Sequence, residues 1–91
     1  MLYMVIEHFA EGRASDIYRR AREHGRRLPA GLDYIDSWVD LEFRRCFQLM
    51  RSDDPKLFEQ WIVHWQDLVR FEVIPVRPSR EAAEKFSGGA R

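Results

Sequence analysis

Residues 32–39 read LDYIDSWV, and this stretch decides the fold. Its β-branched and aromatic residues are typical of a β-strand, in which side chains alternate between the two faces of a sheet. The side chains that point to one of these faces are apolar enough to pack against helices. On the other face, the carboxylate of Asp36 lies between Tyr34 and Trp38. A carboxylate flanked by two large aromatic side chains predicts that this face lines a cavity, because it suits neither open water nor a dry core.

The sequence around this stretch predicts a domain with the element order βαββαβ. Runs rich in β-branched and aromatic residues predict three further strands, at 2–9, 43–50 and 69–76. Apolar residues at helical spacing predict two helices, one from Ser15 as N-cap to a stop at Pro29 and Gly31, and one from Asp54 and Pro55 to about Leu68. This order is typical of the ferredoxin-like α+β arrangement, a four-stranded antiparallel sheet with two helices on one face.

Length and composition limit the classes of protein. Ninety-one residues predict a single domain at 1–78, followed by a C-terminal turn and a flexible tail at 79–91. Fifteen basic and fifteen acidic side chains cancel, so no net charge attracts nucleic acid or a membrane surface. Residues 43–50 also lack the glycine and the aromatic spacing of RNA-recognition modules. No apolar run reaches the length of a signal peptide or a membrane span, and the single Cys46 favours a reducing cytoplasm.

Strand phase divides the sheet residues into two sets. The set expected under the helices is almost wholly apolar: Leu2, Met4, Ile6, Ile35, Val39, Phe47, Leu49, Phe71 and Val73. The set expected on the uncovered face mixes aromatic side chains with carboxylates and an amide: Tyr3, Val5, Glu7, Phe9, Tyr34, Asp36, Trp38, Cys46, Gln48, Met50, Arg70, Glu72 and Ile74. This sorting requires an odd number of residues in the hairpin connection, such as a three-residue loop at 41–43.

The uncovered face predicts a homodimer. Exposed apolar patches larger than a few hundred Å² usually mark interfaces. Two copies packed sheet to sheet would bury the aromatic side chains inside a closed dimeric α+β barrel. The polar residues of the face would then line a pocket between or within the two sheets.

Five separated blocks carry a resemblance to a known family: YMVIE at 3–7, DSWV at 36–39, RCFQLM at 45–50, DDP at 53–55 and FEVIPV at 71–76. They resemble a family of short bacterial proteins known only as a domain of unknown function, and the likeness spans nearly everything up to Pro78. The topology is also similar to the dimeric α+β barrel superfamily, which includes cofactor-independent monooxygenases and isomerases such as muconolactone isomerase. The wider resemblance is one of fold alone, and neither resemblance brings an activity or a catalytic residue with it.

Three carboxylates of the uncovered face are candidates for acid–base chemistry. If Asp36 is grouped with Glu7 and Glu72, burial and the like charge of these carboxylates would raise its pKa. A base that abstracts a proton beside a carbonyl requires such a raised pKa. The alternative is structural, with these carboxylates paired to Arg70 or Arg45 so that they fix the register of a dimer.

The other candidates are a thiol, an amide and two aromatic rings. Cys46 is either a nucleophile or, more simply, a buried inert thiol, because no histidine is visibly placed to activate it. Tyr34 and Trp38 either stack on a flat ligand or pack in the dimer core, and Gln48 would position a substrate. The three histidines form no metal-ligand pattern, so neither a metal nor a cofactor is expected.

Two functions stay open at this point. The first is a cytoplasmic homodimer that binds a small hydrophobic or aromatic ligand, or serves as a structural module. Its ligand-contacting candidates are Glu7, Tyr34, Asp36, Trp38, Cys46, Gln48 and Glu72. The second is a cofactor-independent monooxygenase-like or isomerase-like enzyme in which Asp36 or Glu72 is the base. The absence of a catalytic motif favours the first.

Overall fold

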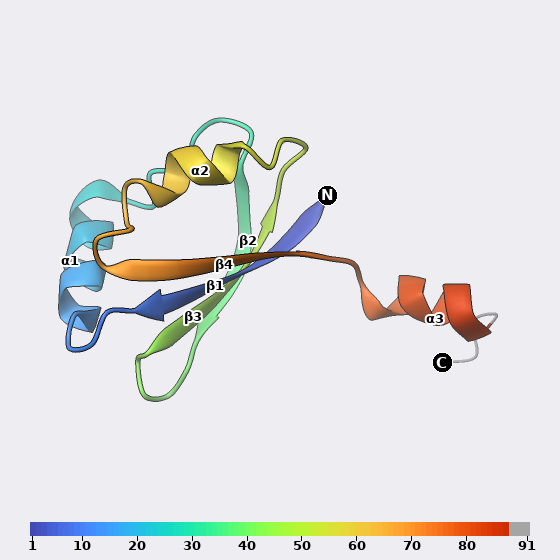
Figure 1. Ribbon diagram of the computed structural model, residues 1–91, viewed down its shortest axis with the longest axis horizontal. Helices are drawn as coiled ribbons and strands as arrows, with labels where there is room; N and C mark the ends of the chain where they lie inside the picture. The colour runs from blue at the N-terminus through green and yellow to red at the C-terminus, as the bar shows by residue number, and fades with distance from the viewer. Residues whose placement is uncertain (88–91) are drawn as a thin grey trace.

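The computed structural model describes residues 1–87 as a four-stranded antiparallel sheet with three helices (Figure 1). The elements follow the chain as β1 (Leu2–Phe9), α1 (Ala14–His24), β2 (Asp33–Val39), β3 (Arg45–Arg51), α2 (Leu57–Ile62), β4 (Val69–Val76) and α3 (Ser79–Ser87). The strand order is β2-β3-β1-β4, and every neighbouring pair is antiparallel. This architecture is consistent with the predicted ferredoxin-like arrangement, and β1 and β4 have the predicted bounds. From residue 88 on, the predicted flexible tail lies outside the described residues.

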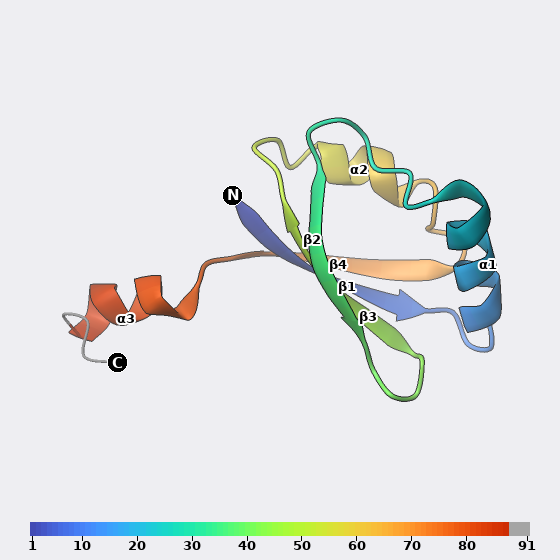
Figure 2. The same cartoon turned by 180° about the vertical axis from the view of Figure 1, so that it is seen from behind.

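Helices α1 and α2 cover one face of the sheet, which we call the inner face (Figure 2). Edge-to-face ring contacts, which aromatic quadrupoles favour, join α2 to the strands. The ring of Phe58 lies 4.9 Å from that of Tyr3, and the ring of Trp61 lies 5.2 Å from that of Phe71. The opposite face, the outer face, has no helix of the described chain packed on it.

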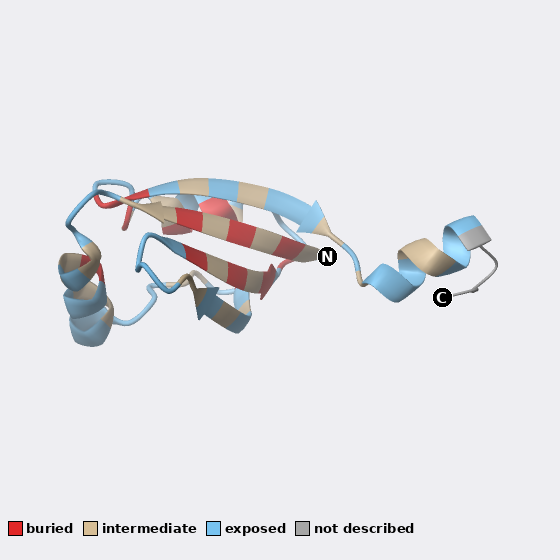
Figure 3. Ribbon diagram, turned by 90° about the horizontal axis from the view of Figure 1, so that it is seen from below, coloured by how far each residue is buried: buried red, intermediate tan, exposed pale blue. Residues whose placement is uncertain are grey.

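The structure reverses the predicted sorting of β1 and β3, so that prediction was wrong. The residues buried on the inner face of these strands are Tyr3, Val5, Glu7, Cys46, Gln48 and Met50. The half-buried residues of the outer face are Leu2, Met4, Ile6, Phe47 and Leu49. Figure 3 shows this alternation as stripes along both strands. On β4 the prediction for Phe71 and Val73 was correct, because both pack against the core. Each phase of β1 carries large apolar side chains, so apolar content alone does not identify the inner face.

A β-bulge in β2 separates residues that were predicted to share a face. Tyr34 lies opposite Met50, but Asp36 lies opposite Leu49, which leaves Ile35 as the extra residue. Directly opposed residues share a face, so Tyr34 lies on the inner face and Asp36 on the outer face. Trp38 follows Asp36 onto the outer face and is 53% exposed. The expected cluster of Tyr34, Asp36 and Trp38 is therefore wrong.

The connection between β2 and β3 also differs from the predicted three-residue loop. Val39 pairs with Cys46, so an even number of residues, 40–45, separates the pair. The carboxylate of Asp40 accepts hydrogen bonds from the backbone N–H groups of Arg44, at 2.7 Å, and Arg45, at 3.2 Å. Phe43 has φ of 58°, a left-handed conformation that closes the turn. This capped turn sets the register that places Cys46 on the inner face.

Both covering helices are shorter than predicted. α1 ends at His24 because Gly25 adopts φ 67° and ψ −164°, a conformation open almost only to glycine. Ser15 lies inside α1 and does not cap it, and Asp16 pairs instead with Arg13 at 2.5 Å. Asp54 accepts a hydrogen bond from the Lys56 N–H, but α2 begins only at Leu57, without a side-chain cap, and it ends at Ile62 and continues as turns to residue 68.

α3 lies apart from the rest of the molecule, beyond the end of β4 (Figures 1 and 2). None of residues 79–86 belongs to the core or to the apolar residues packed against it. Among the described residues, no helix has both the length and the apolar composition that crossing a membrane requires.

The assignment of β3 residues to the inner and outer faces predicts that truncating two neighbouring side chains lowers the free energy of unfolding by unequal amounts. Met50→Ala is expected to lower the free energy of unfolding by about 2–5 kcal/mol, because it opens a cavity in a closed core. Leu49→Ala removes a side chain of similar size from the half-buried outer face and is expected to cost clearly less. Urea unfolding at the lowest usable protein concentration measures both. Equal costs would contradict the assignment.

Candidate functional site

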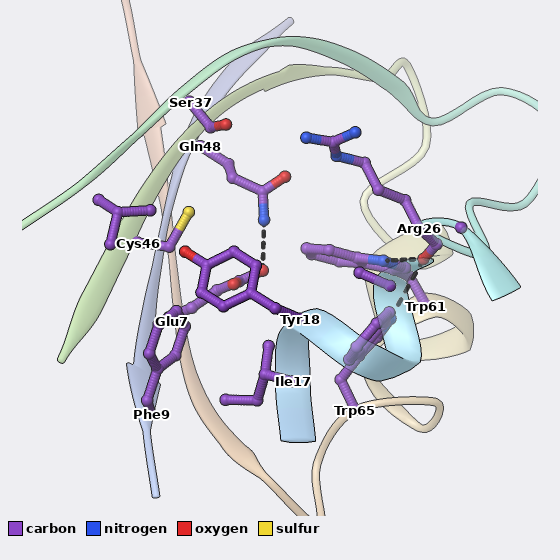
Figure 4. Close-up of a pocket in the computed structure, with 13 residues that line it drawn as sticks. Glu7, Phe9, Ile17, Tyr18, Arg26, Ser37, Cys46, Gln48, Trp61 and Trp65 are labelled. Atoms are coloured by element: carbon purple, nitrogen blue, oxygen red, sulfur yellow. Dashed lines mark hydrogen bonds between the residues drawn. The ribbon is translucent and has the colours of Figure 1, made fainter. Parts of the chain in front are cut away.

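A cavity of about 250 Å³ lies between the inner face of the sheet, α1 and the residues that follow α1 (Figure 4). Strands β1, β2 and β3 form its floor with Glu7, Ser37 and Gln48 among others. Its walls are largely apolar and come from α1, α2 and the turns after α2: Ile17, Tyr18, Ala21, Trp61 and Trp65. The cavity is therefore an apolar space with a small group of polar atoms on its floor.

Glu7 and Gln48 form a buried polar pair on that floor. The side-chain N–H of Gln48 donates a hydrogen bond to the carboxylate of Glu7, and Figure 4 shows the amide oxygen turned away from this bond. That oxygen, Oε1, is buried and has no hydrogen-bond partner among the described residues. Buried carbonyl oxygens nearly always accept a hydrogen bond, so an unpaired one beside a cavity needs an explanation.

Burial raises the pKa of Glu7 from 4.5 to about 7. The positive charge of Arg26 and the hydrogen bond from Gln48 both act in the opposite direction, but neither offsets the loss of hydration. A carboxyl with this pKa changes its protonation state near neutral pH. It can therefore give or take a proton under ordinary conditions, unlike an exposed glutamate.

Arg26 lies over the cavity and joins three parts of the fold. Its backbone carbonyl accepts hydrogen bonds from the indole N–H groups of Trp61, at 2.9 Å, and Trp65, at 3.1 Å. Its guanidinium carbon lies 3.6 Å from the centre of the Tyr34 ring, a cation–π contact. The Tyr34 hydroxyl is hydrogen-bonded to Ser37 at 2.7 Å. The connection from α1 to β2 is thus attached to α2 through its backbone and to β2 through a side chain.

The Cys46 thiol borders the cavity but is a poor nucleophile. Burial raises its pKa to about 12, and the nearby charge of Glu7 acts in the same direction. The thiolate is the reactive form, so the thiol stays protonated and inert near neutral pH. This agrees with the simpler of the two sequence interpretations, a buried inert thiol.

The structure divides the predicted site residues into two groups. Glu7, Cys46 and Gln48 line the cavity, and Tyr34 lies beside it under Arg26. Asp36, Trp38 and Glu72 are exposed, and Asp36 and Trp38 lie on the outer face. Glu72 pairs there with His8, whose hydrogen bond lowers the pKa of the carboxyl. The predicted cluster of Glu7, Asp36 and Glu72 does not form, because Glu7 points to the other side of the sheet.

Sequence reasoning missed the other residues that line the cavity, among them several from outside the predicted strand face: Tyr18, Arg26, Ser37, Trp61 and Trp65. Arg26 falls inside the helix that the sequence predicts from Ser15 to Pro29, where it would lie on the helix surface. The available indication was Gly25, which ends α1 one residue earlier and so removes Arg26 from that surface. Within residues 1–87, no three His, Cys, Asp or Glu side chains are grouped so that they could hold a metal ion.

Comparison with known proteins gives one family match. A family described as "Domain of unknown function (DUF3303)" matches residues 1–90, nearly the whole chain. No curated protein and no solved structure matches significantly.

The raised pKa of Glu7 predicts how stability depends on pH. Glu7 binds a proton more tightly in the folded protein than in the unfolded chain, so its contribution to the free energy of unfolding is greatest below about pH 4.5 and falls as the pH rises to about 7. Glu7→Gln removes this loss, and the variant should gain up to about 3 kcal/mol relative to the wild type between pH 4.5 and 8. Urea unfolding across this range measures the difference.

Glu72→Gln is the matched control. The pKa of Glu72 is lowered, chiefly by its hydrogen bond with His8, so this variant should show no such gain as the pH rises. Parallel pH profiles for the wild type and Glu7→Gln would show that Glu7 ionises normally in the folded protein.

Proposed function

Because the chain belongs to the DUF3303 family, whose description assigns no activity, we propose a function from the cavity itself. The protein binds a small, mostly apolar molecule that carries one hydroxyl or N–H group. The observation that carries this proposal is the unpaired, buried Oε1 of Gln48 at the edge of an apolar cavity. A ligand that donates a hydrogen bond to this oxygen would satisfy it.

The polar floor supports a ligand with a neutral donor group. Glu7 accepts the Gln48 N–H, which fixes the orientation of the amide and leaves its oxygen as the free acceptor. A site built to accept one hydrogen bond favours a ligand with a donor over an analogue without it, because the analogue leaves a buried polar atom unpaired. The selectivity of the site therefore depends on the donor group of the ligand.

The walls limit the size and shape of the ligand. A volume of about 250 Å³ lies just below the usual range for ligand sites, so the cavity accommodates a molecule of at most about one or two rings. Tyr18, Trp61 and Trp65 supply aromatic surfaces on which a flat molecule can stack. These features support the hydrophobic or aromatic ligand expected from the sequence.

A second candidate function is proton-transfer catalysis by a cofactor-independent enzyme. The pKa of Glu7, about 7, favours this candidate, because a general base works best when its pKa lies near the working pH. The carboxylate of Glu7 would accept a proton from the bound molecule. Asp36 and Glu72, the bases suggested by the sequence, are exposed and lie away from the cavity. Glu7 therefore replaces them in this proposal.

The outer face supports the proposed homodimer. Its apolar side chains form a band across all four strands: Met4, Ile6, Trp38, Phe47, Leu49 and Ile74. Trp38 and Ile74 are exposed, and the others are half-buried. A second copy packed sheet to sheet would cover this band, with charged residues such as Arg45 and Arg70 at its rim. The buried, unpaired Cys46 suits the proposed cytoplasmic location.

Ligand binding is tested with a pair of compounds that differ in one donor. 2-Naphthol is expected to raise the melting temperature of the protein, whereas 2-methoxynaphthalene, which lacks the hydroxyl hydrogen, should bind at least about tenfold more weakly. Gln48→Leu should abolish the preference between the two. Ala21→Phe, which fills the cavity from α1, should prevent both from binding.

Asp36→Asn is the control, because Asp36 lies on the outer face and its replacement should leave binding unchanged. Equal affinity for the two compounds, or binding that survives Ala21→Phe, would rule out the cavity as the site. Turnover of a bound compound that disappears in Glu7→Gln while binding persists would identify the enzyme candidate as correct.

Dimerisation is tested with a charge on the outer face. The wild type is expected to have the mass of a dimer in light scattering at micromolar concentration, and Ile6→Lys should convert it to a folded monomer. Val63→Lys is the control, since Val63 is 58% exposed on the other side of the molecule, after α2. A monomeric wild type would remove the dimer and the barrel together.

A further inference from the structure

Helix α3 is an amphipathic segment that lies outside the core of its own subunit. It extends beyond the sheet along the direction of β4, which contributes to a longest dimension of 47 Å (Figure 1). Its apolar side consists of Ala82, Ala83 and Phe86, at the spacing of one helical face. Phe86 is 83% exposed. The remaining residues of the helix that precede Ser87 are polar or charged.

A helix of this length does not persist in water by itself. Helices shorter than about 12 residues are marginal unless an apolar face packs against something. α3 has nine residues, and none of residues 79–86 belongs to the core. The helical pattern with its exposed phenylalanine therefore indicates a partner surface.

The route of the chain directs α3 away from its own sheet. β4 is an edge strand, and only Arg77 and Pro78 separate it from α3. To cover its own outer face, the chain would have to reverse within these two residues, one of which is a proline with a fixed φ. In Figures 1 and 2 the chain instead continues outward.

We infer that α3 is an arm that packs its apolar side against a second copy of this chain, beside the outer face of that copy. The inference rests on the proposed homodimer. In a two-fold dimer each arm would pack against the other subunit, so the interface would contain two copies of α3.

The area of the outer face supports this occupant. Four strands of seven or eight residues, spaced about 4.8 Å apart with a rise of about 3.3 Å per residue, give a projected area of roughly 500 Å². A standard stable interface buries about 800 Å² on each partner. A surface of side chains has more accessible area than its projection, so the sheet alone comes near this value and the two arms would add to it.

A photocrosslinking experiment tests the inference on the full chain. Phe86→p-benzoylphenylalanine keeps an aromatic side chain at this position and reacts with neighbouring C–H groups on irradiation. Equal amounts of ¹⁴N- and ¹⁵N-labelled protein are mixed, irradiated and digested with trypsin. We expect crosslinks of mixed isotope composition to the outer-face peptides, residues 1–13 and 46–51. Crosslinks only within one isotope would show that the arm folds back on its own subunit and would overturn the inference.

A second measurement follows the strength of the dimer. Phe86→Asp should raise the dimer dissociation constant by about tenfold or more, because it removes a buried aromatic side chain from each arm. Leu41→Asp is the matched control, since Leu41 is 96% exposed at the β2–β3 turn and should have no effect.

The outcomes separate the two proposals. A dimeric wild type whose dissociation constant is unchanged by Phe86→Asp would overturn the arm and leave the sheet-to-sheet dimer intact. A monomeric wild type would overturn both. Neither result bears on ligand binding in the cavity, which lies within one subunit.

Discussion

One carbonyl oxygen, that of Arg26, accepts hydrogen bonds from two tryptophan indoles, and the arrangement of the inner face depends on it. Trp61 and Trp65 are both buried, so each indole N–H needs an acceptor within the protein. The two N–H groups share one acceptor, which fixes the α1–β2 connection against α2. Without this attachment the guanidinium of Arg26 would not be held above Tyr34 and the cavity. The left-handed φ of Arg27, 63°, belongs to the same turn and is a conformation that non-glycine residues seldom adopt.

The polar floor of the cavity carries an energetic cost that packing does not explain. Glu7 loses hydration on burial, and Gln48 compensates only through its N–H, which leaves its own oxygen unpaired. Two apolar residues of similar shape would fill the same space without this cost. Proteins retain such unfavourable groups mainly where they contribute to function. The pair is therefore the feature on which the proposed binding function rests.

The sequence predicted the elements of this fold well and the faces of its strands poorly. The bounds of β1 and β4 match because their β-branched and aromatic runs end at clear turn residues. The faces failed because Met4 and Ile6 are as apolar as Tyr3 and Val5, so periodicity cannot say which pair the helices cover. The bulge at Ile35 then moved Tyr34 away from Asp36, and a bulge leaves no reliable mark in a single sequence.

The site was predicted in part for the same reason. Glu7, Cys46 and Gln48 were correctly grouped on one face, since their pairing depends only on the alternation along β1 and β3. Arg26 was missed because its position depends on a tertiary contact, the acceptance of two indole hydrogen bonds, that no local pattern encodes.

The bulge in β2 has an evolutionary consequence. Tyr34, Ser37 and Val39 face the helices, whereas Asp36 and Trp38 face the opposite side. Changes to the cavity and changes to the outer face thus fall on different codons of the same short strand. The two properties can diverge separately among related chains as long as the extra residue is retained. Loss of that residue would move the neighbouring positions to the opposite face of the sheet. A substitution at one of these positions would then alter the other face from the one it alters now.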